Sequence, residues 1–548
     1  MKSESRMLLA VAASVLIFYT WGKFFAPPPP PANVVAPAAV ATTSSPFISP
    51  PPPILAMSAQ DSKIPIETTV LENDKVIVRL SNEGAIPVSW QLKHYLAGDK
   101  APHPIDLVTS ANTIPLRVNL ADFGLEVPAK AHFRHEIDAA DRVVYRWRND
   151  QIELTKTYSL SKGGYEIYVD VAVHNVSSAP LQGRVLLGWE TEDQVPKSGG
   201  FGTIFRKPQD RFTPLYYLDN GVVRDANPKT YAAGKTIEGN LAWAGIENRY
   251  FFATVIPQEQ SEHSKFVGTY QSPDDVTEHL STFVGAAPLI IPAGQQVQQS
   301  FRVYVGPKEI EALKSMGGVH LDEAINYGYF SLVAVPILYL LKFFYQVIHN
   351  YGVAIILLTL FIKLLLHPIT KASMKSMRRM QELQPQLKSL REKYQNDKER
   401  LNIETMQLFR LHKVNPLGGC LPMVVQIPIY IALYKVLWNS IELYRAPFFG
   451  FYRDLSGPDP YFIAPVLLGV AFFLQQHLTP SPTVDPAQKK AMMIMPVMFT
   501  GFMFFLPSGL VIYILVNTLF SVLQQWLMNR GLGFRDLLRG RLTPRAAG

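Results

Sequence analysis

The chain has 548 residues, 48% of them hydrophobic, and a mean hydropathy of +0.08. That length is too great for one domain and that hydropathy is high for a soluble protein, so part of the chain is expected to lie in lipid. The formal net charge of +8 collects in the last third, between and after apolar segments, which indicates membrane orientation rather than nucleic-acid binding. Cys420 is the only cysteine, which excludes an intrachain disulfide and a Cys-pair redox site.

Residues 1–25 are predicted to form an N-terminal transmembrane anchor. The apolar run at 7–25 follows two basic residues, a pattern that fits either a signal peptide or a first membrane helix. A small-x-small sequence begins only at Ala39, well beyond the apolar run, which favours an uncleaved anchor. Residues 26–54 are rich in proline and are expected to form a stiff linker that reaches roughly 80 Å.

Residues 55–320 alternate apolar and polar side chains in short runs, separated by turns rich in Gly, Asn, Asp and Pro. This pattern predicts an exported antiparallel β domain, in the form of a sandwich. The expected strands cover residues 75–80, 143–147, 151–160, 165–174, 184–189 and 251–256. His132, His135 and Glu136 match no zinc motif, so no metal site is predicted, and the domain is interpreted as a folding, docking or scaffolding unit.

Residues 326–348 are predicted to form an amphipathic helix in the outer interface of the membrane. The segment is apolar and rich in aromatic side chains, but it contains Pro336 and Lys342. If it crossed the membrane, the exported domain and the basic loop after Pro368 would lie on the same side, against the positive-inside rule.

The next span, residues 350–369, carries a full positive charge on Lys363. With about 1.5 Å of rise per residue, Lys363 lies roughly 9 Å from the far end of the span, well inside a hydrocarbon core about 30 Å thick. A charge at the centre of a membrane helix costs roughly 2.5 to 3.5 kcal/mol. Two interpretations remain open: the side chain snorkels to the nearer interface, or it lies in a hydrated polar chamber inside a helix bundle.

Residues 370–414 contain eleven Lys or Arg against five acids, which assigns this loop to the cytoplasm. Apolar residues recur every three or four positions on both sides of residues 395–397, which predicts a hairpin of two helices, with Pro385 kinking or shortening the first. The basic face either serves only to orient the loop or binds anionic headgroups or ribosomal RNA. The residues assigned to that contact are Lys371, Lys375, Arg378, Arg379, Lys388 and Arg391.

Four further spans are predicted at residues 415–440, 461–478, 491–506 and 510–528. Together with a basic tail at 529–548, they give six crossings and place both termini in the cytoplasm. Five methionines in the 491–506 span fit either ordinary core filling or an adaptable apolar surface. Polar groups at membrane depth, which we hypothesise to line one cavity with Lys363, are Thr359, Gln426 and Asn517.

Three motifs are specific enough to indicate a family. They read Pro368-Ile369-Thr370-Lys371, then Asn415-Pro416-Leu417-Gly418-Gly419-Cys420-Leu421-Pro422 followed by Gln426 and Pro428, and Pro507-Ser508-Gly509-Leu510-Val511. Through them, residues 326–531 closely resemble the membrane protein insertases of the Oxa/Alb/YidC family. The anchor and the exported domain are similar in layout to the Gram-negative form of that family.

The resemblance implies a polytopic α-helical membrane protein, with six transmembrane helices, a five-helix insertase core and an all-β periplasmic β-supersandwich domain. It implies a non-enzymatic insertase and chaperone in the bacterial inner membrane. Its expected partners are nascent membrane-protein chains, the ribosome, the Sec translocon and the lipid bilayer. No cofactor is expected, since no Gly-rich phosphate loop is present.

In the family, a hydrophilic groove opens to the cytoplasm and the lipid but is closed toward the periplasm. By resemblance, its residues here are Lys363, Thr359, Gln426 and Tyr513. The third and fifth spans would form a slide along which substrate helices leave, with the residues Met423, Ile427, Ile431, Met495, Met498, Phe502 and Met503. The family usually has Arg at the position of Lys363, so this chain keeps the charge without the planar fork of donors.

Two other classes of protein remain as alternatives. A secondary transporter would also bury a charge in a bundle, but it usually shows internal repeats, and none is visible in this sequence. A periplasmic carbohydrate-active protein would place its function in the β domain, and deletion of that domain would then abolish activity.

Overall fold

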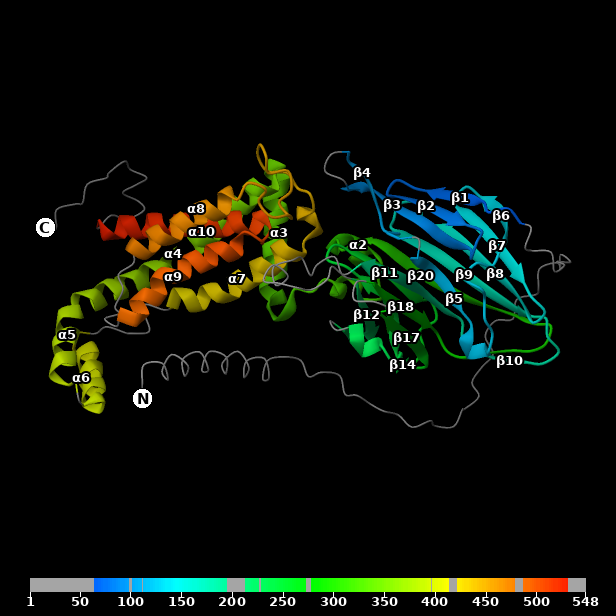
Figure 1. Ribbon diagram of the computed structural model, residues 1–548, viewed down its shortest axis with the longest axis horizontal. Helices are drawn as coiled ribbons and strands as arrows, with labels where there is room; N and C mark the ends of the chain where they lie inside the picture. The colour runs from blue at the N-terminus through cyan, green and yellow to red at the C-terminus, as the bar shows by residue number, and fades with distance from the viewer. Residues whose placement is uncertain are drawn as a thin grey trace.

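The computed structural model describes residues 64–97, 101–110, 112–194, 212–225, 228–272, 277–395, 397–412, 421–478 and 486–530. The expected anchor, the Pro-rich linker, the Asn415–Cys420 part of the second motif and nearly all of the basic tail lie outside these residues. The described chain forms a β domain and a helical bundle, which lie end to end along the long axis of the molecule (Figure 1).

The β domain contains four antiparallel sheets. The largest has nine strands in the order β13-β12-β15-β16-β20-β9-β8-β7-β6, and the second has five in the order β14-β17-β18-β11-β5. A four-stranded sheet has the order β1-β2-β3-β4, and β10 pairs with β19. The strands are β1 Thr68–Glu72, β2 Val76–Ser81, β3 Ile86–Ala97, β4 His103–Asp106, β5 Ile114–Asn119, β6 Arg134–Ala139, β7 Arg142–Arg148, β8 Ile152–Leu160, β9 Glu166–Asn175, β10 Leu181–Gly183, β11 Leu186–Gln194, β12 Thr213–Leu218, β13 Gly221–Arg224, β14 Lys235–Gly239, β15 Leu241–Glu247, β16 Phe251–Pro257, β17 Ser264–Gln271, β18 Thr277–Gly285, β19 Leu289–Ile291 and β20 Gln296–Pro307.

Each of the six segments expected from the sequence contains a strand, although residues 184 and 185 lie outside β11. Burial alternates along β7 and most of β8, whereas β16 is buried at every position. The core lies between the nine-stranded and five-stranded sheets, where aromatic rings meet across the gap. Tyr216 of β12 and Phe266 of β17 have ring centroids 4.7 Å apart across this gap, and within the nine-stranded sheet Trp243 packs edge-on against Phe252. Such rings bury large apolar areas, so the β-rich fold expected from alternation follows from ordinary sandwich packing.

One lysine joins three parts of the β domain. Lys156 of β8 is buried, and its Nζ donates to the carbonyl oxygens of Ala85 at 2.9 Å and Leu116 at 2.5 Å. Both acceptor residues have a positive φ, 49° at Ala85 and 55° at Leu116, which is uncommon for residues other than glycine. Burial lowers the pKa of Lys156 from 10.5 to about 7.

This shift has a definite consequence for stability. Between pH 10.5 and 7, Lys156 is protonated in the unfolded chain but neutral in the folded chain. The free energy of unfolding therefore decreases as the pH falls through this range, and it levels off below about pH 7, where both states are protonated. Lys156→Met should remove up to about 1.4 kcal/mol per pH unit of this slope. Urea unfolding, followed by the circular dichroism of the sheets in detergent, measures it. Lys162→Met, in an exposed turn, is the control, and equal slopes in wild type and Lys156→Met would contradict the assignment.

The helical part begins with the short α2 and then forms the bundle. Its helices are α2 Ile310–Ser315, α3 Ser331–Ile348, α4 Tyr351–Glu382, α5 Gln384–Lys393, α6 Lys398–Leu411, α7 Leu421–Asn439, α8 Ile463–Leu478, α9 Pro486–Met503 and α10 Ser508–Asn529. Among the described residues, three segments are long and apolar enough to cross a membrane, in α3, α4 and α10. Helix α10 packs against α8, α4 and α7, and α3 lies steeply across the end of the bundle nearest the β domain (Figure 1).

The boundary between span and hairpin differs from the expectation. Helix α4 continues through Pro368 to Glu382, so the first part of the predicted loop is a helical extension of the span. The helix is interrupted at Leu383, and Pro385 lies in the first turn of α5. A proline is readily accommodated there because the first turn of a helix needs no backbone donor.

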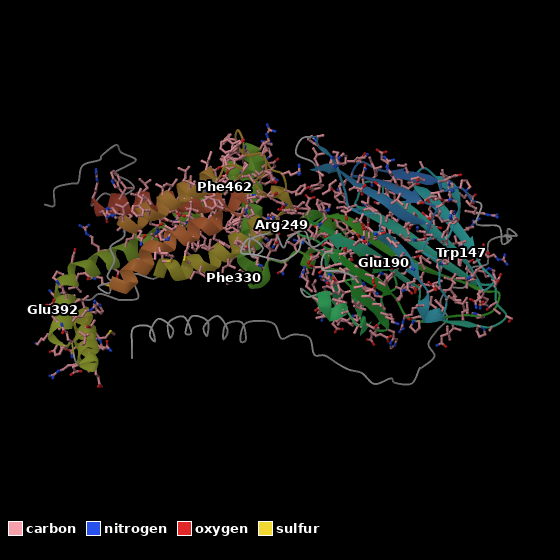
Figure 2. The ribbon with its side chains drawn as sticks, viewed as in Figure 1. Trp147, Glu190, Arg249, Phe330, Glu392 and Phe462 are labelled. Atoms are coloured by element: carbon pink, nitrogen blue, oxygen red, sulfur yellow. The ribbon has the colours of Figure 1, made fainter. Side chains whose placement is uncertain are left out.

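Two clusters attach the β domain to the bundle. Arg249 lies at the junction (Figure 2), where its Nε donates to the carbonyl oxygen of Trp438 at 2.6 Å and its guanidinium stacks 4.5 Å from the Trp438 ring. Beyond α7, the ring of Tyr444 packs edge-on against Tyr250 and Phe251. Since both clusters involve the C-terminal end of α7 and the loop that follows it, the β domain is attached directly to one of the bundle helices.

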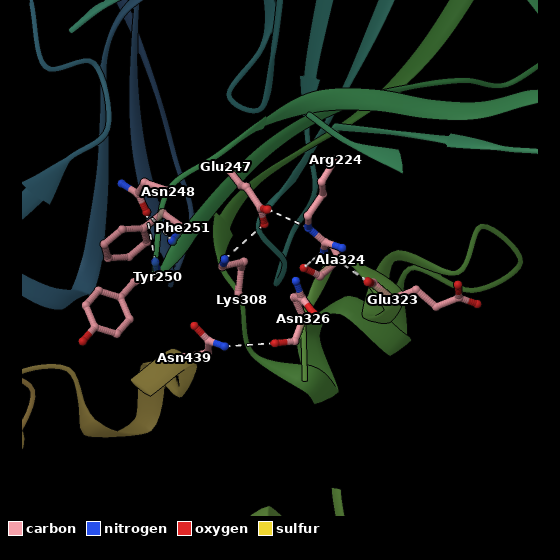
Figure 3. Close-up of polar contacts among 10 residues, drawn as sticks. All are labelled: Arg224, Glu247, Asn248, Tyr250, Phe251, Lys308, Glu323, Ala324, Asn326 and Asn439. Carbon is pink, nitrogen blue, oxygen red and sulfur yellow. Dashed lines mark hydrogen bonds and ion pairs between the residues drawn. The ribbon is translucent and has the colours of Figure 1, made fainter. Parts of the chain in front are cut away.

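The segment between the two domains is also held by polar contacts. Figure 3 shows Glu247 accepting from Arg224 at 2.8 Å and from Lys308 at 3.1 Å. Arg224 also donates to the Ala324 carbonyl, and Asn439 of α7 donates to the Asn326 carbonyl at 2.9 Å. These bonds tie the linking segment to the β domain on one side and to α7 on the other.

Candidate functional site, a buried cation among neutral polar groups

The bundle buries a line of polar side chains between apolar helices. On α4, Thr359 and Lys363 lie one helical turn apart and are 1% and 8% exposed. The facing helix α10 contributes Asn517, which is also buried. Polar groups at this depth need partners, because nothing in a hydrocarbon environment replaces water.

Lys363 points into the bundle. Its Nζ donates to the Oγ of Ser521 on α10 at 2.8 Å, and Ser521 in turn donates to the carbonyl oxygen of Asn517 at 2.9 Å. Among the described residues, no carboxylate forms an ion pair with Lys363. The ammonium therefore has a neutral partner, and two of its three N–H donors have no hydrogen bond to a described residue.

Asn517 connects α10 to α7. Its Nδ2 donates to the hydroxyl of Tyr430, and its Oδ1 accepts from the Nε2 of Gln426 at 3.4 Å. Tyr430 packs edge-on against Tyr513, with ring centroids 5.7 Å apart. The structure thus gathers three of the expected groove residues, Lys363, Gln426 and Tyr513, around one face of α10. Thr359 lies one turn away and donates to its own helix, to the Ile355 carbonyl at 2.6 Å.

A second polar pair extends this line. His367 follows Lys363 by one turn of α4, and its Nδ1 lies 2.9 Å from the Nε2 of Gln524 on α10. Gln524 is 4% exposed. The polar line therefore runs from Thr359 toward the hairpin, away from the β domain.

The end of the bundle next to the β domain is closed by the loop between α7 and α8. Leu455 is fully buried in this loop, and its carbonyl oxygen accepts from the backbone N–H of Gly509 at 2.9 Å. Ser508 donates through its backbone to Gly457 at 2.7 Å and through its hydroxyl to Asp454 at 3.0 Å. Asp459 accepts from Ala464 at 2.7 Å in the first turn of α8, where a helix N-terminus favours negative charge.

The start of α4 completes this closure. Asn350 accepts from the Val353 N–H at 3.1 Å, as an N-cap does, and its Nδ2 donates to the Phe448 carbonyl at 3.0 Å. The Phe448 ring lies so close to Gly352 that a Cβ there would be 1.9 Å from it. Glycine is therefore required at position 352 because of the close approach.

We expect Gly352→Ala to destabilise the protein although alanine is the better helix former by about 1 kcal/mol. Overpacking against Phe448 should cost about 1 to 3 kcal/mol and lower the midpoint of thermal unfolding in detergent. Gly501→Ala is the matched control in α9, since a Cβ there meets nothing within 4 Å, and it should be neutral or stabilising. In a Phe448→Ala background, Gly352→Ala should no longer be destabilising, because the ring that the new Cβ would meet is absent. Destabilisation of equal size at both glycines would contradict this account.

The expected slide residues are mostly on the surface of the bundle. Met495, Met498 and Phe502 of α9 are 55%, 69% and 45% exposed, and Ile427 of α7 is 36% exposed. Ile431 is half-buried.

Two other slide residues stand apart. Met503 is only 3% exposed, so its assignment to an accessible slide is wrong. It lies at the end of α9, where it packs into the apolar core together with Leu506 and Leu510. The side chain of Met423 lies outside what the structure describes.

The six basic residues assigned to the hairpin face are all exposed: Lys371, Lys375, Arg378 and Arg379 on α4, and Lys388 and Arg391 on α5. Among them, only Lys388 has a carboxylate within reach, Glu392 at 4.0 Å, in the part of the hairpin that the structure describes. Helices α5 and α6 lie at the end of the molecule farthest from the β domain, where Glu392 is marked (Figure 2).

Sequence reasoning missed Ser521, His367 and Gln524. A signal existed, because Tyr513, Asn517, Ser521 and Gln524 recur every three or four positions in an otherwise apolar helix. Within the described residues, no group of three or more His, Cys, Asp or Glu could hold a metal ion.

These features define a membrane protein that carries a large β domain on one side and a polar-lined helical bundle. Residues 68–340 match the family described as YidC periplasmic domain, and residues 343–534 match the family described as 60Kd inner membrane protein. A membrane protein insertase YidC from Syntrophus aciditrophicus is 37% identical over 465 residues, which are 82% of each chain. A relative of the same name from Pelobacter propionicus is 34% identical and covers 96% of this chain and 99% of its own length.

The chain belongs to the YidC family of membrane protein insertases. Its β-rich domain is the periplasmic domain of that family, and its apolar helices place it in the inner membrane.

Proposed function

We propose that this chain inserts nascent proteins into the inner membrane and assists their folding, without enzymatic turnover or a cofactor. In this proposal the chain crosses the membrane six times, with both termini and the α5–α6 hairpin in the cytoplasm. Helix α3 lies in the periplasmic interface, where Lys342 pairs with Glu311 at 2.5 Å and with Glu442 at 2.8 Å. Two acids beside Lys342 support an interfacial position, because ion pairs are costly in lipid.

The observation that carries the proposal is the buried ammonium of Lys363 with a neutral partner. A short extracytoplasmic tail must cross lipid, where each unsatisfied backbone group costs several kcal/mol. Polar side chains of α4, α7 and α10 would hydrate the cytoplasmic half of that path, while the loop before α8 closes the periplasmic end. Lys363, about 20 Å from the closed end of α4, would then attract acidic residues of the tail.

Lys363→Leu should lower the rate of insertion of substrates with Asp or Glu in the tail by at least about tenfold, equivalent to about 1.4 kcal/mol of lost attraction. Lys363→Arg keeps the charge and should retain most of the activity. The measurement is protease protection of a single-span substrate in proteoliposomes that contain the purified chain. Full activity of Lys363→Leu on acidic tails would refute this role.

We propose two separate contacts for the basic residues of the hairpin. The extension of α4 leaves the membrane first, so Lys371 and Lys375 are placed to meet anionic headgroups, each worth roughly 1 kcal/mol. Helix α5 lies farther out, where Lys388 and Arg391 are placed to meet ribosomal RNA. The Sec translocon and nascent chains are the remaining proposed partners, by analogy with the family.

Paired neutral variants separate the two contacts. Lys388→Gln with Arg391→Gln should weaken ribosome binding in co-sedimentation and lower the salt dependence of log K by about one per lost phosphate contact. Lys371→Gln with Lys375→Gln should leave ribosome binding unchanged but reduce the gain in insertion rate that anionic lipids bring. If both pairs affected ribosome binding equally, this division would be wrong.

A further inference from the structure

Ser521 is the one described residue that holds the Lys363 ammonium. Its hydroxyl lies on the α4-facing side of α10 and accepts from Nζ at 2.8 Å. The same hydroxyl donates its own proton to the Asn517 carbonyl, one turn earlier on α10, at 2.9 Å. Because the hydroxyl proton is used within the helix, the oxygen lone pairs are left to face the ammonium.

This geometry restricts a side chain that otherwise moves freely. A lysine has four rotatable carbons and a point charge, and near the end of a membrane helix it tends to snorkel toward the headgroups. The hydrogen bond to Ser521 instead directs Lys363 sideways, against α10 and into the bundle, where it is 8% exposed. Without that acceptor, no other hydrogen bond to a described residue holds the ammonium inside.

We propose that Ser521 is a positioning residue, which holds the Lys363 ammonium at the depth where an acidic substrate tail passes. The inference rests on the function proposed above for Lys363 and adds a residue that determines specificity for tail charge. A lysine needs such a partner more than an arginine does, because a compact ammonium has no rigid fork that would fix its orientation. The neighbouring polar groups of α10 keep the site wet, while Ser521 sets the position of the charge.

The test compares two hydroxyls on the same helix. Thr518 is 2% exposed and donates to the Ile514 carbonyl at 2.7 Å, the same bond within the helix that Ser521 makes, but no hydrogen bond joins it to Lys363. Ser521→Ala and Thr518→Ala therefore remove equivalent intrahelical bonds, and only the first removes the partner of the ammonium. Ser521→Thr restores a hydroxyl at position 521.

The experiment measures insertion rates in proteoliposomes for a single-span substrate with Asp in its tail and for the matched substrate with Asn. The ratio of the rate for the Asp tail to the rate for the Asn tail should fall about tenfold in Ser521→Ala, as expected for loss of one hydrogen bond to a charged group. It should stay unchanged in Thr518→Ala and recover in Ser521→Thr. In a Lys363→Leu background, Ser521→Ala should have no further effect on the ratio.

Several outcomes would overturn the inference. They are an unchanged ratio in Ser521→Ala, an equal loss with both tails, and a failure of Ser521→Thr to recover the ratio. A Ser521→Ala effect that persists without Lys363 would also overturn it. Lys363→Leu, measured in parallel, tells a failure of this inference from a failure of the proposed function. If Lys363→Leu inserts acidic tails normally, the proposed role of Lys363 is refuted. If Lys363→Leu is defective but Ser521→Ala is normal, only the positioning role of Ser521 is refuted.

Discussion

In the part of the chain that the structure describes, the Lys363 ammonium lies inside the bundle, hydrogen-bonded to a neutral hydroxyl and without an ion-paired carboxylate. An ion pair with a carboxylate would lower the cost of burying the ammonium, but it would also neutralise the charge that could attract a second acidic group. Among the described residues a neutral group takes this place: the Ser521 hydroxyl accepts from the ammonium and donates to the backbone carbonyl of Asn517, and neither group carries a negative charge. Such a site is costly to bury, and that cost is the usual mark of a functional group inside a membrane protein.

The two ends of the bundle are built by different means. At the β-domain end, the backbone N–H groups of Ser508 and Gly509 donate to the carbonyls of Gly457 and Leu455, which joins the start of α10 to the α7–α8 loop, and Phe448 packs directly on Gly352. At the other end, α4 extends beyond the bundle as a continuous basic helix. The β-domain end is tightly packed and hydrogen-bonded, whereas the polar line of α4 and α10 continues from Lys363 toward the hairpin through His367 and Gln524.

The β domain is attached to one of the helices that carry the polar groups of the bundle. Arg249 and the aromatic cluster around Tyr444 hold it to the C-terminal end of α7, the helix that also carries Gln426 and Tyr430. In α9, by contrast, Met495 and Met498 are exposed on the surface of the bundle, and the helix packs against α8.

The sequence by itself determined the division into a β domain and apolar helices, since periodicity and hydropathy depend only on the order of residues along the chain. It also singled out Lys363, because a charge inside an apolar span is visible without a structure. Only the tertiary structure decided that the lysine points into the bundle and that the hydroxyl of Ser521 accepts its hydrogen bond. It also decided that Met503 is buried while Met498 is exposed. Those outcomes depend on which face of each helix meets its neighbours, and that packing is set by contacts between residues more than a hundred positions apart.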